Sequence, residues 1–191
     1  YPPTEGTVTI GRQSLQKISF KECRKHCGVV MQEGFIFGDT IANNIVPDGN
    51  MIDKKRLLYA VEMANIRDFV ESLPLKYNTK IGNTGQGLSQ GQKLRILIAR
   101  AIYRNPDYLF FDEATNALDT DNEKVIQGNL EKFFKDKTVV IVAHRLSTVK
   151  NADQIVVLKE GEITEKGTHD ELITRQGDYY RLVKNQLELS A

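Results

Sequence analysis

Two adjacent carboxylates, Asp112 and Glu113, follow a short apolar run in the middle of the chain. The run, residues 108–111 (YLFF), predicts a β-strand buried on both faces of a sheet. In a parallel sheet such a strand delivers its acids to the carboxyl edge, where α/β proteins bind ligands. One acid can hold Mg²⁺, and the other can act as a general base on a water molecule. A strand that stops at a solvated Asp-Glu turn is the alternative that this pair alone leaves open.

Three further polar side chains lie at the ends of predicted elements. Gln32 follows a strand at 28–31, and His144 follows a buried strand at 138–143. Ser89 lies among glycines at the start of an amphipathic helix, and the N–H groups and dipole of a helix start suit a phosphate. The simpler alternatives are a solvated strand end for Gln32, a structural role for His144 and plain helix capping for Ser89, and locally the capping explanation is favoured.

Buried strands alternate with helices around these residues, which predicts an α/β fold with a mostly parallel sheet. The segment 41–105 predicts helices interrupted by a glycine loop, and therefore a helical insert between two strands. Helix starts are expected at Asp53, Ser89 and Thr168. Strands are predicted at 7–10, 28–31, 108–111, 138–143 and 154–158, with a hairpin turn at 160–161, and helices at 54–64, 66–73, from 89 to 104, after 121, from 168 and at 178–187.

The composition is that of a soluble globular chain: 191 residues, 40% hydrophobic and 27% charged. The net charge of +1 gives no bulk electrostatic case for nucleic acid or an anionic membrane. A chain that starts at Tyr1 is expected to begin inside a longer gene product. Cys23 and Cys27, with His26 between them, could hold a metal, but zinc needs about four ligands, so two reduced thiols are favoured.

The polar strand ends and the glycine-flanked serine occur in an order that resembles the ATPase domain of ABC transporters. The flanking segments FGDTIANNI and IARAIYRNPDYLFFDEAT are similar to the exporter branch of that family, with peptide exporters, including bacteriocin exporters, ahead of lipid or drug exporters. The resemblance covers nearly the whole chain. Its motifs are VVMQ at 29–32 (Q-loop), LSQGQ at 88–92 (signature), LFFDEA at 109–114 (Walker B), ALD at 117–119 (D-loop) and AHR at 143–145 (H-switch).

The resemblance implies a catalytic site for ATP and Mg²⁺ at the strand ends. Asp112 would hold Mg²⁺, and Glu113 would orient and deprotonate the attacking water. Gln32 would contact Mg²⁺ or that water, and His144 the γ-phosphate. Such a site works by positioning and by stabilising charge in a loose phosphoryl transition state.

The resemblance also implies partners. Ser89, Gly91 and Gln92 would reach ATP held by a second ATPase domain, with Asp119 at the seam of this head-to-tail dimer. The dimer would couple hydrolysis to a transmembrane domain of an exporter, at the cytoplasmic face of the cell membrane.

The sequence departs from the family pattern at two places. Gln90 replaces the first of two usual glycines in the signature, while Ser89 and Gly91 remain. No G-x-x-x-x-G-K-[ST] loop occurs in the 191 residues, so the P-loop is missing. The resemblance therefore implies a domain truncated after its P-loop helix and inactive by itself, without the P-loop strand and the N-terminal β-subdomain. Residues 1–40 and 106–191 are expected to form the RecA-like core, and residues 41–105 the helical signature subdomain.

Two rival interpretations stay open. DNA-maintenance ATPases of the same superfamily insert a long coiled coil or zinc modules between the Q-loop and the signature. Here only 56 residues separate Gln32 from Ser89, without sustained heptads or cysteine clusters. The second rival is a fragment or regulatory module without catalytic turnover, which the missing P-loop favours and which nucleotide binding would test.

Overall fold

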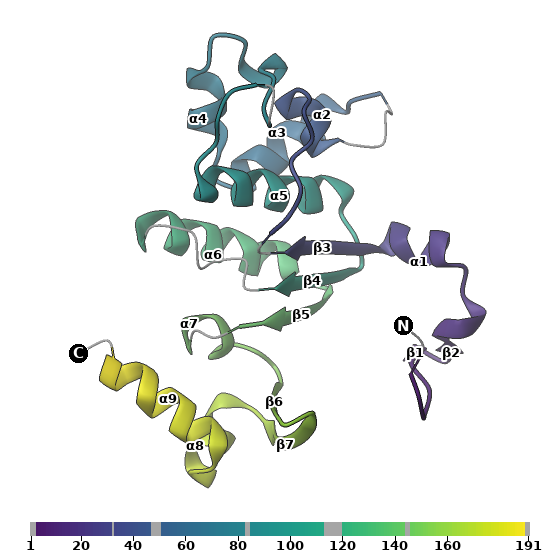
Figure 1. Ribbon diagram of the computed structural model, residues 1–191, viewed down its shortest axis with the longest axis vertical. Helices are drawn as coiled ribbons and strands as arrows, with labels where there is room; N and C mark the ends of the chain where they lie inside the picture. Colours follow the sequence, from purple (N-terminus) through teal and green to yellow (C-terminus); the bar gives the residue numbers. More distant parts are fainter. Residues whose placement is uncertain are drawn as a thin grey trace. The chain divides into compact units, whose positions relative to one another are not determined.

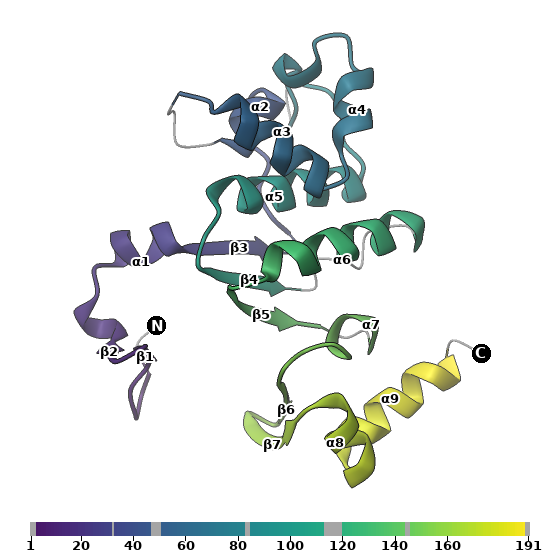
Figure 2. The ribbon, with the colours of Figure 1, turned by 180° about the vertical axis from the view of Figure 1, so that it is seen from behind.

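The computed structural model describes residues 3–31, 33–46, 51–82, 85–112, 120–143 and 146–189. The chain divides into two compact units, Tyr1–Val140 and Ile141–Ala191 (Figures 1 and 2). The elements of the first unit are β1 (Thr9–Ile10), β2 (Gln13–Ser14), η1 (Leu15–Lys17), α1 (Phe20–His26), β3 (Cys27–Met31), α2 (Ile41–Ile45), α3 (Lys54–Met63), α4 (Arg67–Ser72), η2 (Lys76–Asn78), α5 (Gln90–Arg104), β4 (Tyr108–Asp112) and α6 (Thr120–Phe134). Strand β5 (Thr138–Val142) spans the boundary, and the second unit holds α7 (Leu146–Val149), β6 (Ile155–Lys159), β7 (Glu162–Gly167), α8 (His169–Arg175) and α9 (Asp178–Leu189).

The central sheet has the strand order β3-β4-β5. Strands β3 and β4 are parallel, with Val30 opposite Phe111 and Met31 opposite Asp112. This parallel pairing agrees with the predicted class, because parallel neighbours need a crossover and the chain supplies one through α2 to α5. Strands β5 and β6 belong to different sheets.

Burial of the central strands differs from the prediction. Val30, Leu109 and Phe111 are buried, but their neighbours on the opposite face are exposed. The prediction that residues 108–111 are buried on both faces is therefore wrong, as is the prediction of a fully buried strand at 138–143. The exposed fractions are 56% for Val29, 54% for Met31, 40% for Phe110, 48% for Val140 and 52% for Val142.

Helices α5 and α6 explain the buried face. Helix α5 contacts β3 (Figures 1 and 2). Phe111 of β4 packs edge-on against Phe134 of α6, with ring centroids 5.3 Å apart. Successive strand residues point to opposite faces, so helices on one side bury only every second residue. The apolar stripe of α5 is buried as its periodicity predicts; it comprises Leu94, Leu97, Ile98, Ala101 and Ile102.

Cap geometry confirms two predicted helix boundaries, the start at Asp53 and the end after Arg104. The Asp53 carboxylate accepts hydrogen bonds from the N–H groups of Lys55 and Arg56 at the start of α3. Helix α5 ends at Asn105, which has a left-handed backbone (φ +47°) and precedes Pro106. Left-handed caps and a following proline are common helix stops.

The second unit, described by itself, is a hairpin packed with helices. Strands β6 and β7 pair antiparallel, and α8 begins at Thr168 with the predicted capping box. The Thr168 hydroxyl accepts from the Glu171 N–H, and the Glu171 carboxylate accepts from the Thr168 N–H. The core of this unit contains Ile155, Val157, Leu172, Tyr179 and Val183.

Candidate functional site

Asp112 lies where the sequence predicts, at the carboxyl end of β4. It is exposed, and its register partner Met31 is the last residue of β3. Among the described residues, no hydrogen bond or ion pair engages the Asp112 carboxylate. Carboxylate oxygens at a strand edge fit a hard cation such as Mg²⁺. Four other predicted site residues lie outside the described residues: Gln32, Glu113 and His144 of the strand ends, and Asp119 of the predicted dimer seam.

Ser89 is the N-cap of α5 and forms a capping box with Gln92. The Ser89 hydroxyl oxygen accepts from the Gln92 N–H at 3.1 Å, and the Gln92 side-chain oxygen accepts from the Ser89 N–H at 2.9 Å. The capping explanation of Ser89 is therefore confirmed. The reciprocal bonds also show why the Ser-x-x-Gln spacing occurs here.

The capping box leaves some hydrogen-bond donors at the start of α5 without an acceptor in the helix. A hydroxyl has one hydrogen besides its acceptor lone pairs, so Ser89 still has a donor to offer. The N–H groups of Gln90 and Gly91 lie in the first turn and have no acceptor within the helix. Ser89 and Gln90 are exposed, and Gly91 and Gln92 are half-buried. An accessible helix start with such donors suits an anion.

No hydrogen bond or ion pair among the described residues joins Asp112 to the Ser89 cap. A group of three or more His, Cys, Asp or Glu residues suited to a metal is also absent from the described part of the chain.

Sequence reasoning missed a buried polar residue, Asn44 of α2. Its side chain is completely buried. The Asn44 amide nitrogen donates to the carbonyl oxygens of Phe37 and Thr40, both at 3.0 Å, and its oxygen accepts from the Phe37 N–H at 2.8 Å. These bonds fix the loop that precedes α2, because buried polar groups are costly to leave unpaired.

Arg100 of α5 completes this network from 56 positions away in the sequence. Its guanidinium donates to the Asn44 carbonyl oxygen at 2.7 Å and to the Phe35 carbonyl oxygen at 3.0 Å, and it lies 5.0 Å from the Phe37 ring centre. Burial lowers the pKa of Arg100, but a guanidinium remains charged at neutral pH. The network therefore holds the segment that follows Gln32 against the helix that begins at Ser89. A polar residue between Ile41 and Ile45 was the available signal.

A pocket of about 370 Å³ lies elsewhere in the first unit and contains none of the predicted site residues. Its lining combines apolar and basic side chains from α3, α5, α6 and the turn that follows α6. The lining residues are Arg56, Tyr59, Ile102, Asn105, Lys132, Phe133 and Lys137.

Comparisons with known proteins identify the family of the chain. The sequence profile of the ABC transporter family matches residues 1–116. The chain is 45% identical over 186 residues to mouse "ATP-binding cassette sub-family B member 5", covering 97% of this chain and 15% of that protein. It is 42% identical over 188 residues to the "ATP-dependent lipid A-core flippase" of Syntrophus aciditrophicus, covering 98% of this chain and 31% of the relative.

A comparison with solved structures gives the same family. The solved structure of a bacterial Atm1-family ABC exporter with ATP bound superposes with a TM-score of 0.93 at 36% identity, over 98% of this chain and 33% of that one. The chain belongs to the ABC transporter family, and it is a nucleotide-binding domain of the exporter type. It spans between about one seventh and one third of the length of these relatives. Within the described residues, no helix is long and apolar enough to cross a membrane.

Proposed function

We propose that this chain acts as part of the ATP-hydrolysing motor of an ABC exporter, at the cytoplasmic face of a membrane. The observation that carries the proposal is the parallel pairing of β3 and β4. This pairing places Asp112, the last residue of β4, opposite Met31, the residue before Gln32. The match to an exporter with ATP bound supports it. The substrate that is transported is set by membrane segments, and the preference for peptide export stays a prediction.

In the proposed mechanism, Asp112 would hold Mg²⁺ directly or through water, and Glu113 would accept a proton from the attacking water. Gln32 would orient that water, and His144 would contact the γ-phosphate. Bound Mg²⁺ would neutralise phosphate charge. The residues of the chain contribute mainly by position, because phosphoryl transfer needs alignment and charge stabilisation more than covalent chemistry.

Composite sites would form between two such domains. The free donors at the start of α5 would contact the γ-phosphate of ATP held by the partner, with Ser89 and Gly91 nearest and Gln92 holding the turn in shape. Asp119 would lie at the seam.

Ser89 is expected to act on the partner's nucleotide. Subunits of the longer protein that carry Ser89→Arg should be mixed with subunits whose P-loop lysine is replaced. The mixed dimer then has one complete site, and a photoreactive ATP analogue should label the Ser89→Arg subunit. If that subunit instead loses labelling at its own site, the head-to-tail arrangement is wrong.

Thr168→Arg is the matched control for this experiment. It removes a capping box of the same kind from α8, at a cost of about 1 kcal/mol, as Ser89→Arg does from α5. A cap lost at Thr168 should leave nucleotide labelling unchanged. Equal losses in both variants would show that Ser89 acts through helix stability alone.

The 191-residue chain by itself is expected neither to hydrolyse ATP nor to bind it tightly. A triphosphate and the two acids at 112 and 113 together bring several negative charges, which in this family a P-loop lysine and a row of N–H groups offset. No G-x-x-x-x-G-K-[ST] loop occurs in this sequence. Calorimetric titration with Mg-ATP should give no saturable heat, while the longer protein should bind and hydrolyse ATP. Micromolar binding by this chain would contradict the expectation, and an inactive longer protein would favour a regulatory module.

A further inference from the structure

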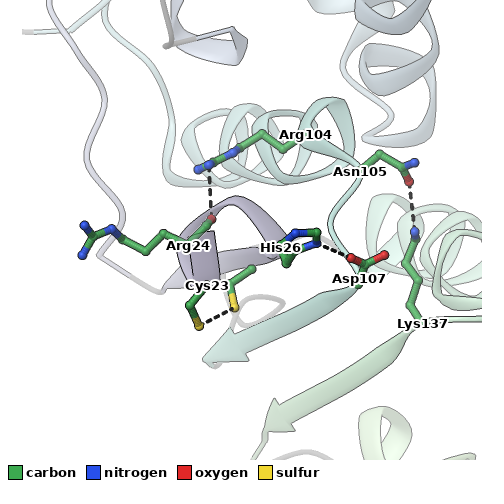
Figure 3. A network of polar contacts seen from close by, with 8 residues as sticks. Cys23, Arg24, His26, Arg104, Asn105, Asp107 and Lys137 are labelled. Carbon is green, nitrogen blue, oxygen red and sulfur yellow. Dashed lines mark hydrogen bonds and ion pairs between the residues drawn. The ribbon is translucent and has the colours of Figure 1, made fainter. Parts of the chain in front are cut away.

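Cys23 and Cys27 form a close pair of thiols that ATP hydrolysis does not use. Their sulfur atoms lie 4.0 Å apart (Figure 3). Both residues are half-buried. Cys23 lies in α1, and Cys27 is the first residue of β3. We propose that this pair is a modification site, at which a small soluble disulfide such as oxidised glutathione converts the two thiols into an intramolecular disulfide.

The geometry needs only a small local change. A disulfide bond is about 2.05 Å long, so the two sulfur atoms must approach each other by about 2 Å. Cys27 has an extended backbone, with φ −108° and ψ 133°, directly after the last turn of α1. The chain therefore changes from helix to strand at the second cysteine, and side-chain rotation with a small adjustment of this junction can supply the approach.

Metal binding is the weaker alternative for this pair. His26, between the cysteines, points toward Asp107, with its Nδ1 atom 2.6 Å from the carboxylate (Figure 3). No third His, Cys, Asp or Glu ligand joins the thiols in the described part of the chain. Two thiolates are too few for a structural zinc site. Two neighbouring thiols can instead be oxidised to a disulfide, which needs no further side chain of the protein.

One guanidinium group, that of Arg104, acts on the pair. The Arg104 guanidinium donates to the Arg24 carbonyl oxygen at 3.3 Å, in the last turn of α1 (Figure 3). Burial raises the pKa of Cys27, the hydrogen bond with Cys23 raises it further, and the charge of Arg104 opposes both effects. Thiol exchange proceeds through the thiolate, so the raised pKa of Cys27 slows its attack at neutral pH, and the charge of Arg104 lessens this effect.

The reaction is a two-step thiol–disulfide exchange. The thiolate of one cysteine attacks one sulfur of oxidised glutathione, breaks its S–S bond and releases one glutathione thiolate. The thiolate of the other cysteine then attacks the protein sulfur of the mixed disulfide and releases the second glutathione. The two cysteines are oxidised, one glutathione disulfide is reduced to two thiols, and the two cysteine protons end on the glutathione sulfurs.

The proposed disulfide would stiffen the start of β3. The segment between the cysteines is already joined to the residue that precedes β4, because the Asp107 N–H donates to the His26 carbonyl oxygen at 3.1 Å. Strand β3 then runs in register with β4 as far as Met31 and Asp112. A covalent closure at Cys27 would therefore restrict the beginning of the strand that leads to Gln32.

The test incubates the reduced 191-residue chain with mixtures of reduced and oxidised glutathione, followed by acid quench, alkylation and intact-mass measurement. The wild-type chain should lose two hydrogens and carry no glutathione. Cys23→Ser and Cys27→Ser should each retain one glutathione on the remaining thiol. Wild-type chain that stays reduced, carries two glutathiones or forms intermolecular disulfides would overturn the proposal.

Two further measurements test whether the native fold favours the disulfide, beyond the short distance between the two cysteines in the sequence. The equilibrium constant for disulfide formation should be at least about tenfold larger in the native chain than in urea, because the fold holds the sulfurs close together. Equal or smaller values in the native chain would overturn the proposal. Phenylarsine oxide, which bridges two neighbouring thiols, should bind the native wild-type chain with one arsenic per chain. Failure of this probe to bind would overturn the proposal even if the serine variants are unfolded.

Discussion

Glu113→Gln is expected to abolish steady-state ATP hydrolysis by the longer protein that contains this chain, while ATP binding and closure of the dimer persist. The amide has nearly the shape of the carboxylate but does not accept a proton from water. Loss of a general base slows a reaction by about 10²–10⁴-fold. Glu113 follows Asp112 directly, and Asp112 lies at the carboxyl end of a strand paired in parallel with β3.

The measurement is phosphate release at saturating Mg-ATP, with ATP binding followed separately by nucleotide trapping. Glu162→Gln is the matched control, since Glu162 is an exposed carboxylate in the second unit and loses the same charge. It should hydrolyse ATP at the rate of the unaltered protein. Near-normal turnover in Glu113→Gln would remove Glu113 from the role of base. A loss of both binding and turnover would indicate a structural role instead.

Local signals account for the parts of the fold that the sequence predicted well. Asp53, Ser89 and Thr168 each cap a helix as expected, because a cap depends on residues within one turn. The apolar stripe of α5 was equally predictable, since its spacing is a property of one helix. The class of the sheet followed from strands that alternate with helices.

Long-range packing accounts for the errors. The apolar runs at 28–31, 108–111 and 138–143 predicted strands correctly, but a run shows only that a strand is apolar, not that both faces are covered. Helix α1 was missed because none of its residues is buried and its large apolar residue, Phe20, is 70% exposed. A helix without an apolar face has no periodicity to detect.

The candidate site shows the same difference between local and long-range information. The position of Asp112 at a strand end and of Ser89 at a helix start could be predicted, because each depends on one element. The roles of Gln32, Glu113, Asp119 and His144 came from resemblance to a family, and they stay predictions. The Asn44–Arg100 network was not predictable, since a buried amide needs partners that lie far away in the sequence.

Asn44→Ala is expected to lower the free energy of unfolding of the first unit by about 3 kcal/mol. The Asn44 side chain is fully buried and accepts the hydrogen bond of the Phe37 N–H, which would lose this acceptor. The Arg100 guanidinium, partly removed from water, would lose its contact with the Asn44 side-chain oxygen at 3.2 Å. A methyl group restores neither interaction and leaves a small cavity, so the desolvation cost of both groups remains.

Asn43→Ala provides an internal control, because it makes the same substitution one residue earlier in α2. The Asn43 side chain is exposed and bonds the Asp39 carboxylate at 3.1 Å, so its loss should change stability by no more than about 0.5 kcal/mol. Urea unfolding gives both values, and hydrogen exchange at Phe37 reports the broken contact directly. Because Asn44 fixes the segment after Gln32 to the helix that begins at Ser89, exchange should rise at Phe37 in Asn44→Ala and stay unchanged in Asn43→Ala. Equal effects of the two substitutions would show that the network stabilises neither the loop nor its attachment to α5.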